Sequence, residues 1–166
     1  MALGSCGGGD PPPNGRPQAG SGAGVLNGLV ALEQAAVAAW AAIGAVLAGD
    51  GRDYARLIRD REAEHVERVS ALVRELGGTP PQPRTAREYE RQFPRIDGQP
   101  RDALRFADDL ERRLVRAHLD ALTSLPEVGQ RRVAAEIAAE ESRDLAVVRV
   151  LAGTPAAGQA FVTGVS

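Results

Sequence analysis

Two residues in the first half of the chain, Glu62 and His65, have the types and the spacing of a metal-binding pair. They lie in the charged stretch REAEHVER, residues 61–68, and His65 is one of only two histidines. Residues three apart project from the same side of a helix, so this carboxylate and this imidazole could reach one ion. The simpler alternative is a partly exposed ion pair with Arg61 or Arg68, worth about 0.5 kcal/mol or less.

A second candidate, Glu33, is the only charged residue in a long apolar stretch, residues 25–48. A buried carboxylate is costly unless it is protonated, paired or bound to a metal. The stretch is long enough to cross a membrane, for which ~20 apolar residues suffice. Its alanines and glycines, and a central carboxylate that would cost roughly 2.5 kcal/mol in a bilayer, favour a helix buried in a bundle instead.

Apolar residues at helical spacing predict an all-α chain without any competing strand signal. We expect helices at residues 25–48, 53–76, 102–122 and 127–151. Residues 77–101 contain five prolines and predict an extended crossover with one short turn at 85–91. Twenty-five extended residues reach ~80 Å, whereas a 24-residue helix is ~36 Å long. The crossover between helices 2 and 3 can therefore return along the bundle, so that helix 3 runs parallel to helix 2.

The two halves of the chain repeat each other. VRELGGTP at residues 73–80 and VRVLAGTP at residues 148–155 are identical at six of eight positions. When the two halves are aligned with a gap of four residues, about one helical turn, acids of one half fall opposite acids of the other. Each half then has one glutamate on its first helix. Its second helix has a Glu-x-x-His pair in the first half and a Glu-x-x-Asp pair in the second. The predicted metal ligands are Glu33, Glu62, His65, Glu111, Glu141 and Asp144.

Other assignments remain open at this stage. A repeat without the deletion would place Glu140 opposite His65, and Asp108, Glu136 and Glu140 are alternatives one helical step from the chosen acids. His118 lies two turns beyond Glu111, where a buried, hydrogen-bonded histidine is expected. Two aromatic residues are expected to pack in the core, Trp40 and Tyr54.

Six such residues on four helices form the pocket that di-iron carboxylate proteins use. Carboxylates with some imidazole suit Fe²⁺ and Mn²⁺. The five acids would bring five negative charges into the core, of which two divalent cations would offset four. No arginine is expected on the four inner stripes, so the arginines are predicted on the outer faces.

The chain is similar to ferritin-like domain proteins of the kind associated with the bacterial cell envelope, over roughly residues 25–152. The similarity rests on one stretch in each predicted long helix: LNGLVALEQAAVAAW, EAEHVERVSALVR, DDLERRLVRAH and IAAEESRDLAVVR. The resemblance implies a four-helix bundle with two iron ions, or manganese, and Fe²⁺ oxidation or peroxide reduction as candidate activities. Helix 4 of that superfamily usually carries Glu-x-x-His, whereas this chain has Asp144 at the histidine position, which puts the second metal position in doubt.

The chain divides into a Gly/Pro-rich tail at 1–22, a bundle at 23–153 and a C-terminal tail at 154–166. Leu3-Gly4-Ser5-Cys6 resembles the end of a lipoprotein signal, without the basic and apolar segments that precede one. It suggests a lipid anchor at Cys6 on the extracytoplasmic side of the cell envelope; the cytoplasm is the alternative. The single cysteine excludes an internal disulfide.

The formal net charge of −2 gives no electrostatic case for nucleic acid as a partner. Metal ions are the expected partners, and a homodimer is left open. The rival function is a metal-free helical module of the cell envelope, serving structure or interaction. That rival predicts arginines folded over the acids, or protonated acids.

Overall fold

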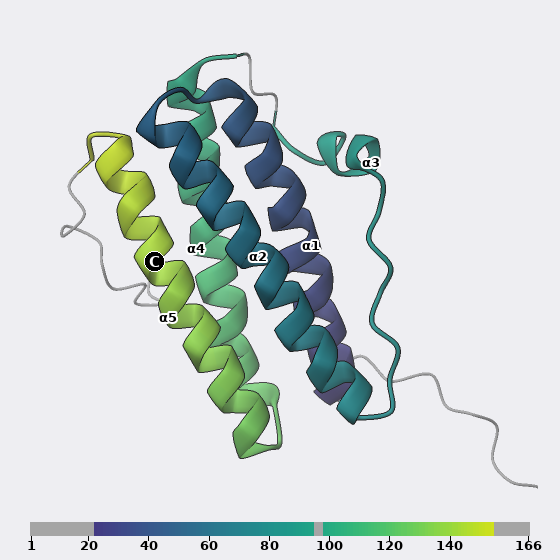
Figure 1. Cartoon of the computed structure of the whole chain (residues 1–166). Helices are drawn as coiled ribbons and strands as arrows, with labels where there is room; N and C mark the ends of the chain where they lie inside the picture. Colours follow the sequence, from purple (N-terminus) through teal and green to yellow (C-terminus); the bar gives the residue numbers. More distant parts are fainter. Residues whose placement is uncertain (1–21, 95–97, 155–166) are drawn as a thin grey trace, which may run out of the picture.

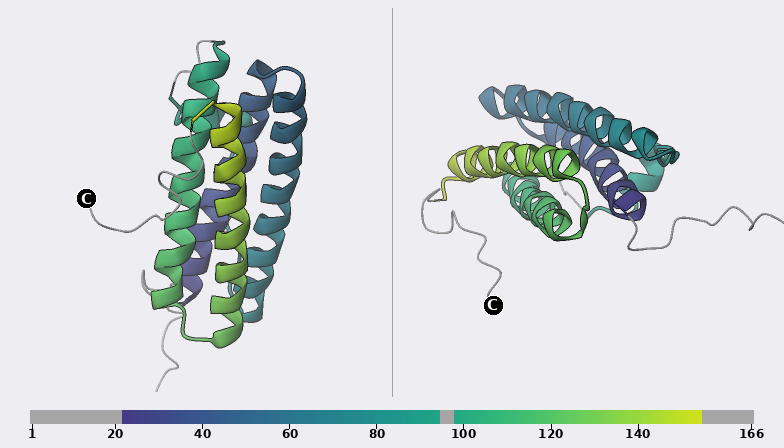
Figure 2. Two further views of the ribbon diagram at one scale, coloured as in Figure 1. Left: turned by 90° about the vertical axis from the view of Figure 1, so that its left-hand side faces the viewer. Right: turned by 90° about the horizontal axis from the view of Figure 1, so that it is seen from below.

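The computed structural model describes residues 22–94 and 98–154, and every regular element in these ranges is a helix (Figure 1). Four long helices pack side by side as a bundle (Figure 2). The helices are α1 (Gly22–Val46), α2 (Asp50–Glu75), α3 (Ala86–Glu90), α4 (Pro100–Ser124) and α5 (Val128–Leu151). The predicted all-α four-helix bundle is confirmed, and the long helices begin and end within three residues of the predicted positions.

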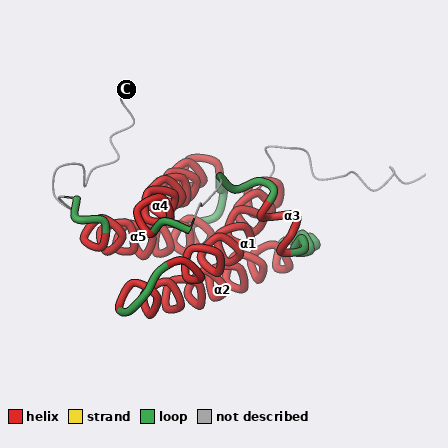
Figure 3. Tube along the Cα trace, turned by 90° about the horizontal axis from the view of Figure 1, so that it is seen from above, coloured by secondary structure: helices red, strands yellow, loops and turns green. Residues whose placement is uncertain are grey.

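The chain order produces two antiparallel helix pairs, α1 with α2 and α4 with α5 (Figure 1). Between them, residues 76–94 return along the bundle, and α2 and α4 run in the same direction, as the crossover length predicted. The short turn predicted at 85–91 is α3, which lies outside the bundle beside α1 (Figure 3). The tails were predicted at 1–22 and 154–166, and their residues 1–21 and 155–166 lie outside the described residues. Gly22, predicted in the first tail, is the first residue of α1.

The crossover is held against α1 by polar contacts. The side-chain amide of Gln34 donates a hydrogen bond of 2.8 Å to the carbonyl oxygen of Pro81. Tyr89 of α3 is buried, and its hydroxyl accepts a hydrogen bond of 3.1 Å from the backbone N–H of Arg84. The outer side of α1 is therefore covered in part by residues that follow α2.

Helix α1 meets the length and hydropathy of a membrane span, with a mean hydropathy of 1.7 over its most apolar window. In the bundle, however, its inner face packs against α2 and α4, and Glu33 in its middle is fully buried. Its apolar character is accounted for by this position in the core. Tyr54, expected in the core, is 39 % exposed on α2, so that expectation was wrong.

The core consists of two apolar clusters with a polar layer between them. One cluster includes Trp40, Ile43, Ile58, Leu114 and Val148. The other includes Leu26, Val30, Val69, Val73 and Ile137. Along α1, α2 and α5, the predicted ligands fall between the residues of the first cluster and those of the second. On α4, Glu111 lies at the edge of the first cluster, between Leu110 and Leu114. The bundle thus seals the acids at both ends with hydrocarbon, which excludes water and makes an unpaired charge there costly.

Candidate metal centre

All six predicted ligands are buried on the inner faces of the helices. The exposed fraction is 2 % for Asp144 and 0 % for the other five. The alternative of a partly exposed ion pair at Glu62 and His65 is therefore wrong. By contrast, the side chains of Glu136 and Glu140 are 51 % and 32 % exposed. Of these three glutamates on α5, Glu141 is the fully buried one.

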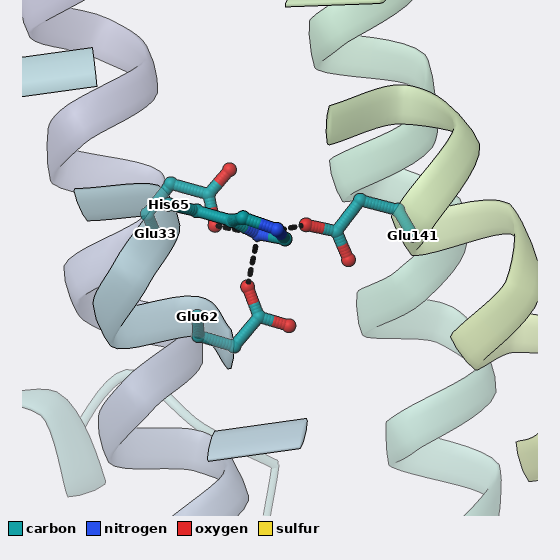
Figure 4. Close-up of side chains that lie close together, drawn as sticks. All are labelled: Glu33, Glu62, His65 and Glu141. Carbon is teal, nitrogen blue, oxygen red and sulfur yellow. Dashed lines mark hydrogen bonds and ion pairs between the residues drawn. The ribbon is translucent and has the colours of Figure 1, made fainter. Parts of the chain in front are cut away.

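Four of the six residues converge around the ring of His65 (Figure 4). His65 Nδ1 lies 2.8 Å from Oε1 of Glu141, 3.3 Å from Oε2 of Glu62 and 3.8 Å from Oε2 of Glu33. One ligand atom from each residue lies within 4.8 Å of the others. They come from three helices, α1, α2 and α5 (Figure 4). This four-residue set, Glu33, Glu62, His65 and Glu141, is called the first ligand set below.

The other ring nitrogen of His65 faces outward to a carboxylate. His65 Nε2 lies 2.7 Å from Oε2 of Glu140, and Arg68 donates to both oxygens of Glu140 at 3.3 Å. A proton on Nε2 bonded to Glu140 leaves Nδ1 as the nitrogen that can ligate an ion, an arrangement common around metal-binding histidines. The sequence offered Glu140 only as an alternative ligand, and the structure places it as the partner that orients His65.

Glu33 is held by the second histidine of the chain. Nε2 of His118, on α4, makes a short hydrogen bond with Oε1 of Glu33, and both side chains are fully buried. The expectation of a buried, hydrogen-bonded histidine is confirmed. What the sequence did not show is that its partner belongs to the first ligand set, so His118 fixes one oxygen of Glu33 while Oε2 has no hydrogen-bond partner.

Glu111 lies beside the first ligand set and contacts α1 through an aromatic residue. The indole Nε1–H of Trp40 donates a hydrogen bond of 2.8 Å to Oε1 of Glu111. Trp40 is packed in the core as expected, but it is also the hydrogen-bond donor to a predicted ligand. The buried carboxylates of Glu141 and Glu62 are near enough to Glu111 to act on its charge.

Asp144 is already paired with a cation of the protein. The guanidinium of Arg61 makes a short ion pair with Oδ1 of Asp144, and the side chain of Arg61 is only 15 % exposed. Burial raises the pKa of Asp144, although Arg61 acts to lower it. The expectation that every arginine would lie on an outer face was therefore wrong. Arg61 lies one turn before His65 on α2, and its long side chain carries the guanidinium to Asp144 on α5.

Burial raises the pKa of two of the carboxyls. Together with the charge of Glu141, it raises the pKa of Glu62 to about 10 in spite of the hydrogen bond with His65. Burial also raises the pKa of Glu111 well above its ordinary value, and the charges of Glu141 and Glu62 act in the same direction. Without a cation from outside, Glu62 therefore retains its proton at neutral pH.

The histidine and Glu33 respond in the opposite sense. Burial acts to raise the pKa of Glu33, but the hydrogen bond with His118 and the nearby ring of His65 outweigh it and hold the pKa at about 2. Burial acts to lower the pKa of His65, but the neighbouring carboxylates, Glu141 first, raise the pKa well above that of an ordinary histidine. The ion-free site is thus a network of carboxylates that hold protons on His65 and on one another.

The donor set fits a hard or borderline cation. Several buried carboxylate oxygens have no hydrogen-bond partner among the described residues: Oε2 of Glu33, Oε1 of Glu62, Oε2 of Glu111, Oε2 of Glu141 and Oδ2 of Asp144. Buried oxygens without donors are costly, and a cation would satisfy several of them together. Oxygen ligands with one imidazole match the preferences of Fe²⁺ and Mn²⁺.

Comparison with known proteins agrees with this architecture. The ferritin-like domain family matches residues 21–154, so the chain belongs to this family. A conserved hypothetical protein from Mycobacterium tuberculosis has a similar structure, with a TM-score of 0.70, 17 % identity, and coverage of 78 % of this chain and 96 % of that one. A Dps mutant from Listeria innocua also has a TM-score of 0.70, with 13 % identity and coverage of 82 % and 96 %. A search of curated proteins found no match.

Proposed function

We propose that this ferritin-like protein binds iron or manganese in the middle of its bundle. The observation that carries the proposal is the convergence of three carboxylates and one imidazole, all buried, with ligand atoms within 4.8 Å of one another. The buried oxygens without hydrogen-bond partners give the same set a reason to hold a cation.

Each residue of the site has a role in this proposal. Glu33, Glu62, His65 and Glu141 would hold the first ion. Glu140 orients His65 through its Nε2, and His118 orients Glu33 through its Oε1. Because the two apolar clusters lie on either side, the site keeps bulk water away from the ion.

The sequence predicted a dinuclear centre, which would add a second metal ion to the one held by the first ligand set. A second ion would need Glu111 and Asp144, which are buried but do not belong to the first ligand set. Two bound iron ions would supply redox chemistry, either Fe²⁺ oxidation or peroxide reduction. In that reaction the chain's own carboxylates would shift between binding modes, while Trp40 and His118 keep Glu111 and Glu33 in place.

A metal-free helical module of the cell envelope, serving structure or interaction, is the second candidate. The ion pair between Arg61 and Asp144 favours it, since an arginine folded over a buried acid is what a site without metal needs. The proton retained by Glu62 favours the same candidate.

Metal content decides between the two. The full chain would be loaded anaerobically with Fe²⁺, desalted and analysed for iron, with a Glu62→Ala/His65→Ala variant beside it. The proposal expects bound iron and a raised melting temperature in the wild type, and loss of both in the variant. No bound iron and an unchanged melting temperature would leave the metal-free module. An exposed pair from the same helix, Glu64→Ala/Arg56→Ala, is the matched control.

The location of the protein is a separate proposal that rests on the sequence alone. Cys6, the candidate site of a lipid anchor in the cell envelope, lies outside the described residues. Incorporation of labelled palmitate into the full chain in a bacterial host, and its loss on Cys6→Ser, would support the anchor. Absence of label in the wild type would count against it.

A further inference from the structure

The two halves of the repeat are unequal in the structure. In the first half, His65 turns Nδ1 towards Glu33, Glu62 and Glu141. In the second half, the residue that the repeat places opposite His65 is Asp144, and it faces an arginine instead. The first half forms a set of ligand atoms within 4.8 Å, whereas Glu111 and Asp144 do not belong to that set.

Arg61 is in the right place to act as a cation of the site. It directly precedes Glu62 on α2 and crosses to α5, where its Nη1 contacts Oδ1 of Asp144. Its side chain is 15 % exposed and that of Asp144 is 2 % exposed, so the pair is largely withdrawn from water. A guanidinium is permanently charged and binds carboxylates with fixed geometry, and such a pair in a core of low polarity is not easily exchanged.

From this arrangement we propose that the guanidinium of Arg61 takes the place of a second metal ion, so that the protein binds one ion per chain, in the first ligand set. This inference rests on the proposed metal-binding function and limits the number of bound ions to one per chain. A second divalent ion at Asp144 would have to break the ion pair and leave Arg61 beside it, and two such like charges repel strongly where water is excluded. Asp144 therefore holds Arg61 and is not a metal ligand.

Other contacts of the second half agree with this role. One oxygen of Glu111 is occupied by the indole N–H of Trp40 at 2.8 Å, so it offers a single free oxygen, Oε2. Asp144 likewise keeps only Oδ2 free. An aspartate side chain is one methylene shorter than a glutamate, so these two oxygens converge less readily on one ion than the first ligand set does.

The test is the number of Mn²⁺ ions bound to the full chain under anaerobic conditions, counted by native mass spectrometry and by electron paramagnetic resonance. We expect one Mn²⁺ in the wild type, with the spectrum of an isolated ion. Arg61→Gln should bind two, and their spectrum should show magnetic coupling. Arg143→Gln is the matched control and should still bind one, because Arg143 lies 4.0 Å from the same Oδ1 but is 61 % exposed.

A second variant covers the case in which Arg61→Gln fails to fold because Asp144 is left unpaired. In Arg61→Gln/Asp144→His both charges are removed, and the second half regains the Glu-x-x-His spacing of the first half. This variant should also bind two coupled ions. If it and Arg61→Gln still bind one ion, Arg61 does not hold a metal position, and the inference fails.

The wild-type count separates this inference from the function on which it rests. Two tightly bound, coupled ions in the wild type would overturn the role of Arg61 and leave metal binding intact. No bound ion in the wild type or in any variant would overturn both.

Discussion

The indole Nε1–H of Trp40 on α1 donates a 2.8 Å hydrogen bond to Oε1 of Glu111 on α4. This contact joins the first helix pair to the second beside the first ligand set. Trp40 is the only tryptophan of the chain, so its fluorescence reports on this one location.

Loading the protein with Mn²⁺ or Fe²⁺ should quench the emission of Trp40, because a paramagnetic ion would lie close to the ring's hydrogen-bond partner. The quenching should reach its limit at the same number of equivalents as metal analysis. If iron binds and the emission of Trp40 stays constant during the titration, the ion lies elsewhere.

Trp40→Phe should lower the free energy of unfolding by about 1–3 kcal/mol, because Glu111 loses its hydrogen-bond donor.

Glu140→Ala should weaken metal binding although Glu140 lies outside the first ligand set. Its Oε2 is 2.7 Å from Nε2 of His65, and without it the ring can rotate or change tautomer. Loss of a comparable partner of a ligating histidine lowers metal affinity about 10–100-fold. Competition with a fluorescent chelator would measure the change.

The matched control for that variant is Glu136→Ala. Glu136 contacts the same arginine, Arg68, at 2.8 Å, but its side chain is 51 % exposed and no contact joins it to His65 among the described residues. It should bind metal as the wild type does. Equal losses in both variants would mean that the negative charge near α5 matters, and not the orientation of His65.

The fold and most of the buried acids could be predicted from the sequence, for physical reasons. Glycine and proline mark the helix ends, and Gly49 and Gly77 do adopt left-handed φ values of 53° and 71°. Glu33 stands alone in an apolar segment, where only a buried role is plausible. Apolar periodicity then placed Glu62 and Glu141 on inner faces, where both are fully buried.

The partners of those acids could not be predicted in the same way. Periodicity gives the direction of a Cβ atom, but Arg61 has a long side chain whose guanidinium ends far from its Cβ. The contacts of Arg61 with Asp144 and of His118 with Glu33 each join two different helices. How far one helix is shifted along its axis relative to another cannot be read from a single sequence. The count of buried charges therefore omitted Arg61, a cation that the protein itself supplies beside the predicted ligands.

His118→Phe should lower metal affinity about 10–100-fold, because Glu33 loses the group that fixes its Oε1. His118→Gln keeps a hydrogen-bond donor in the same position and should recover much of the affinity. Isothermal titration with Mn²⁺ would measure both. If both variants bound as tightly as the wild type while remaining folded, His118 would have only a packing role.

The stability of the ion-free protein should fall as pH rises, because His65 and Glu62 hold protons in the folded chain at pH values where the unfolded chain has released them. Glu62 is the group whose part in this decline a substitution can test. Its pKa is about 10 in the folded chain and 4.5 in the unfolded one, so the unfolded chain binds fewer protons between these values. The free energy of unfolding then decreases with pH, by up to about 1.4 kcal/mol per pH unit for one proton. Glu33, with a pKa of about 2, acts only below that window.

Urea unfolding in the presence of a chelator, from about pH 6 to about pH 9, would measure this slope. Glu62→Gln cannot ionise and should reduce the slope to the part that His65 contributes, whereas the exposed neighbour Glu64→Gln should leave it unchanged. With metal bound, Glu62 is already deprotonated in the folded chain, so loading should abolish the decline and release protons. A wild-type slope that metal does not alter would show that Glu62 keeps its proton and is not a ligand.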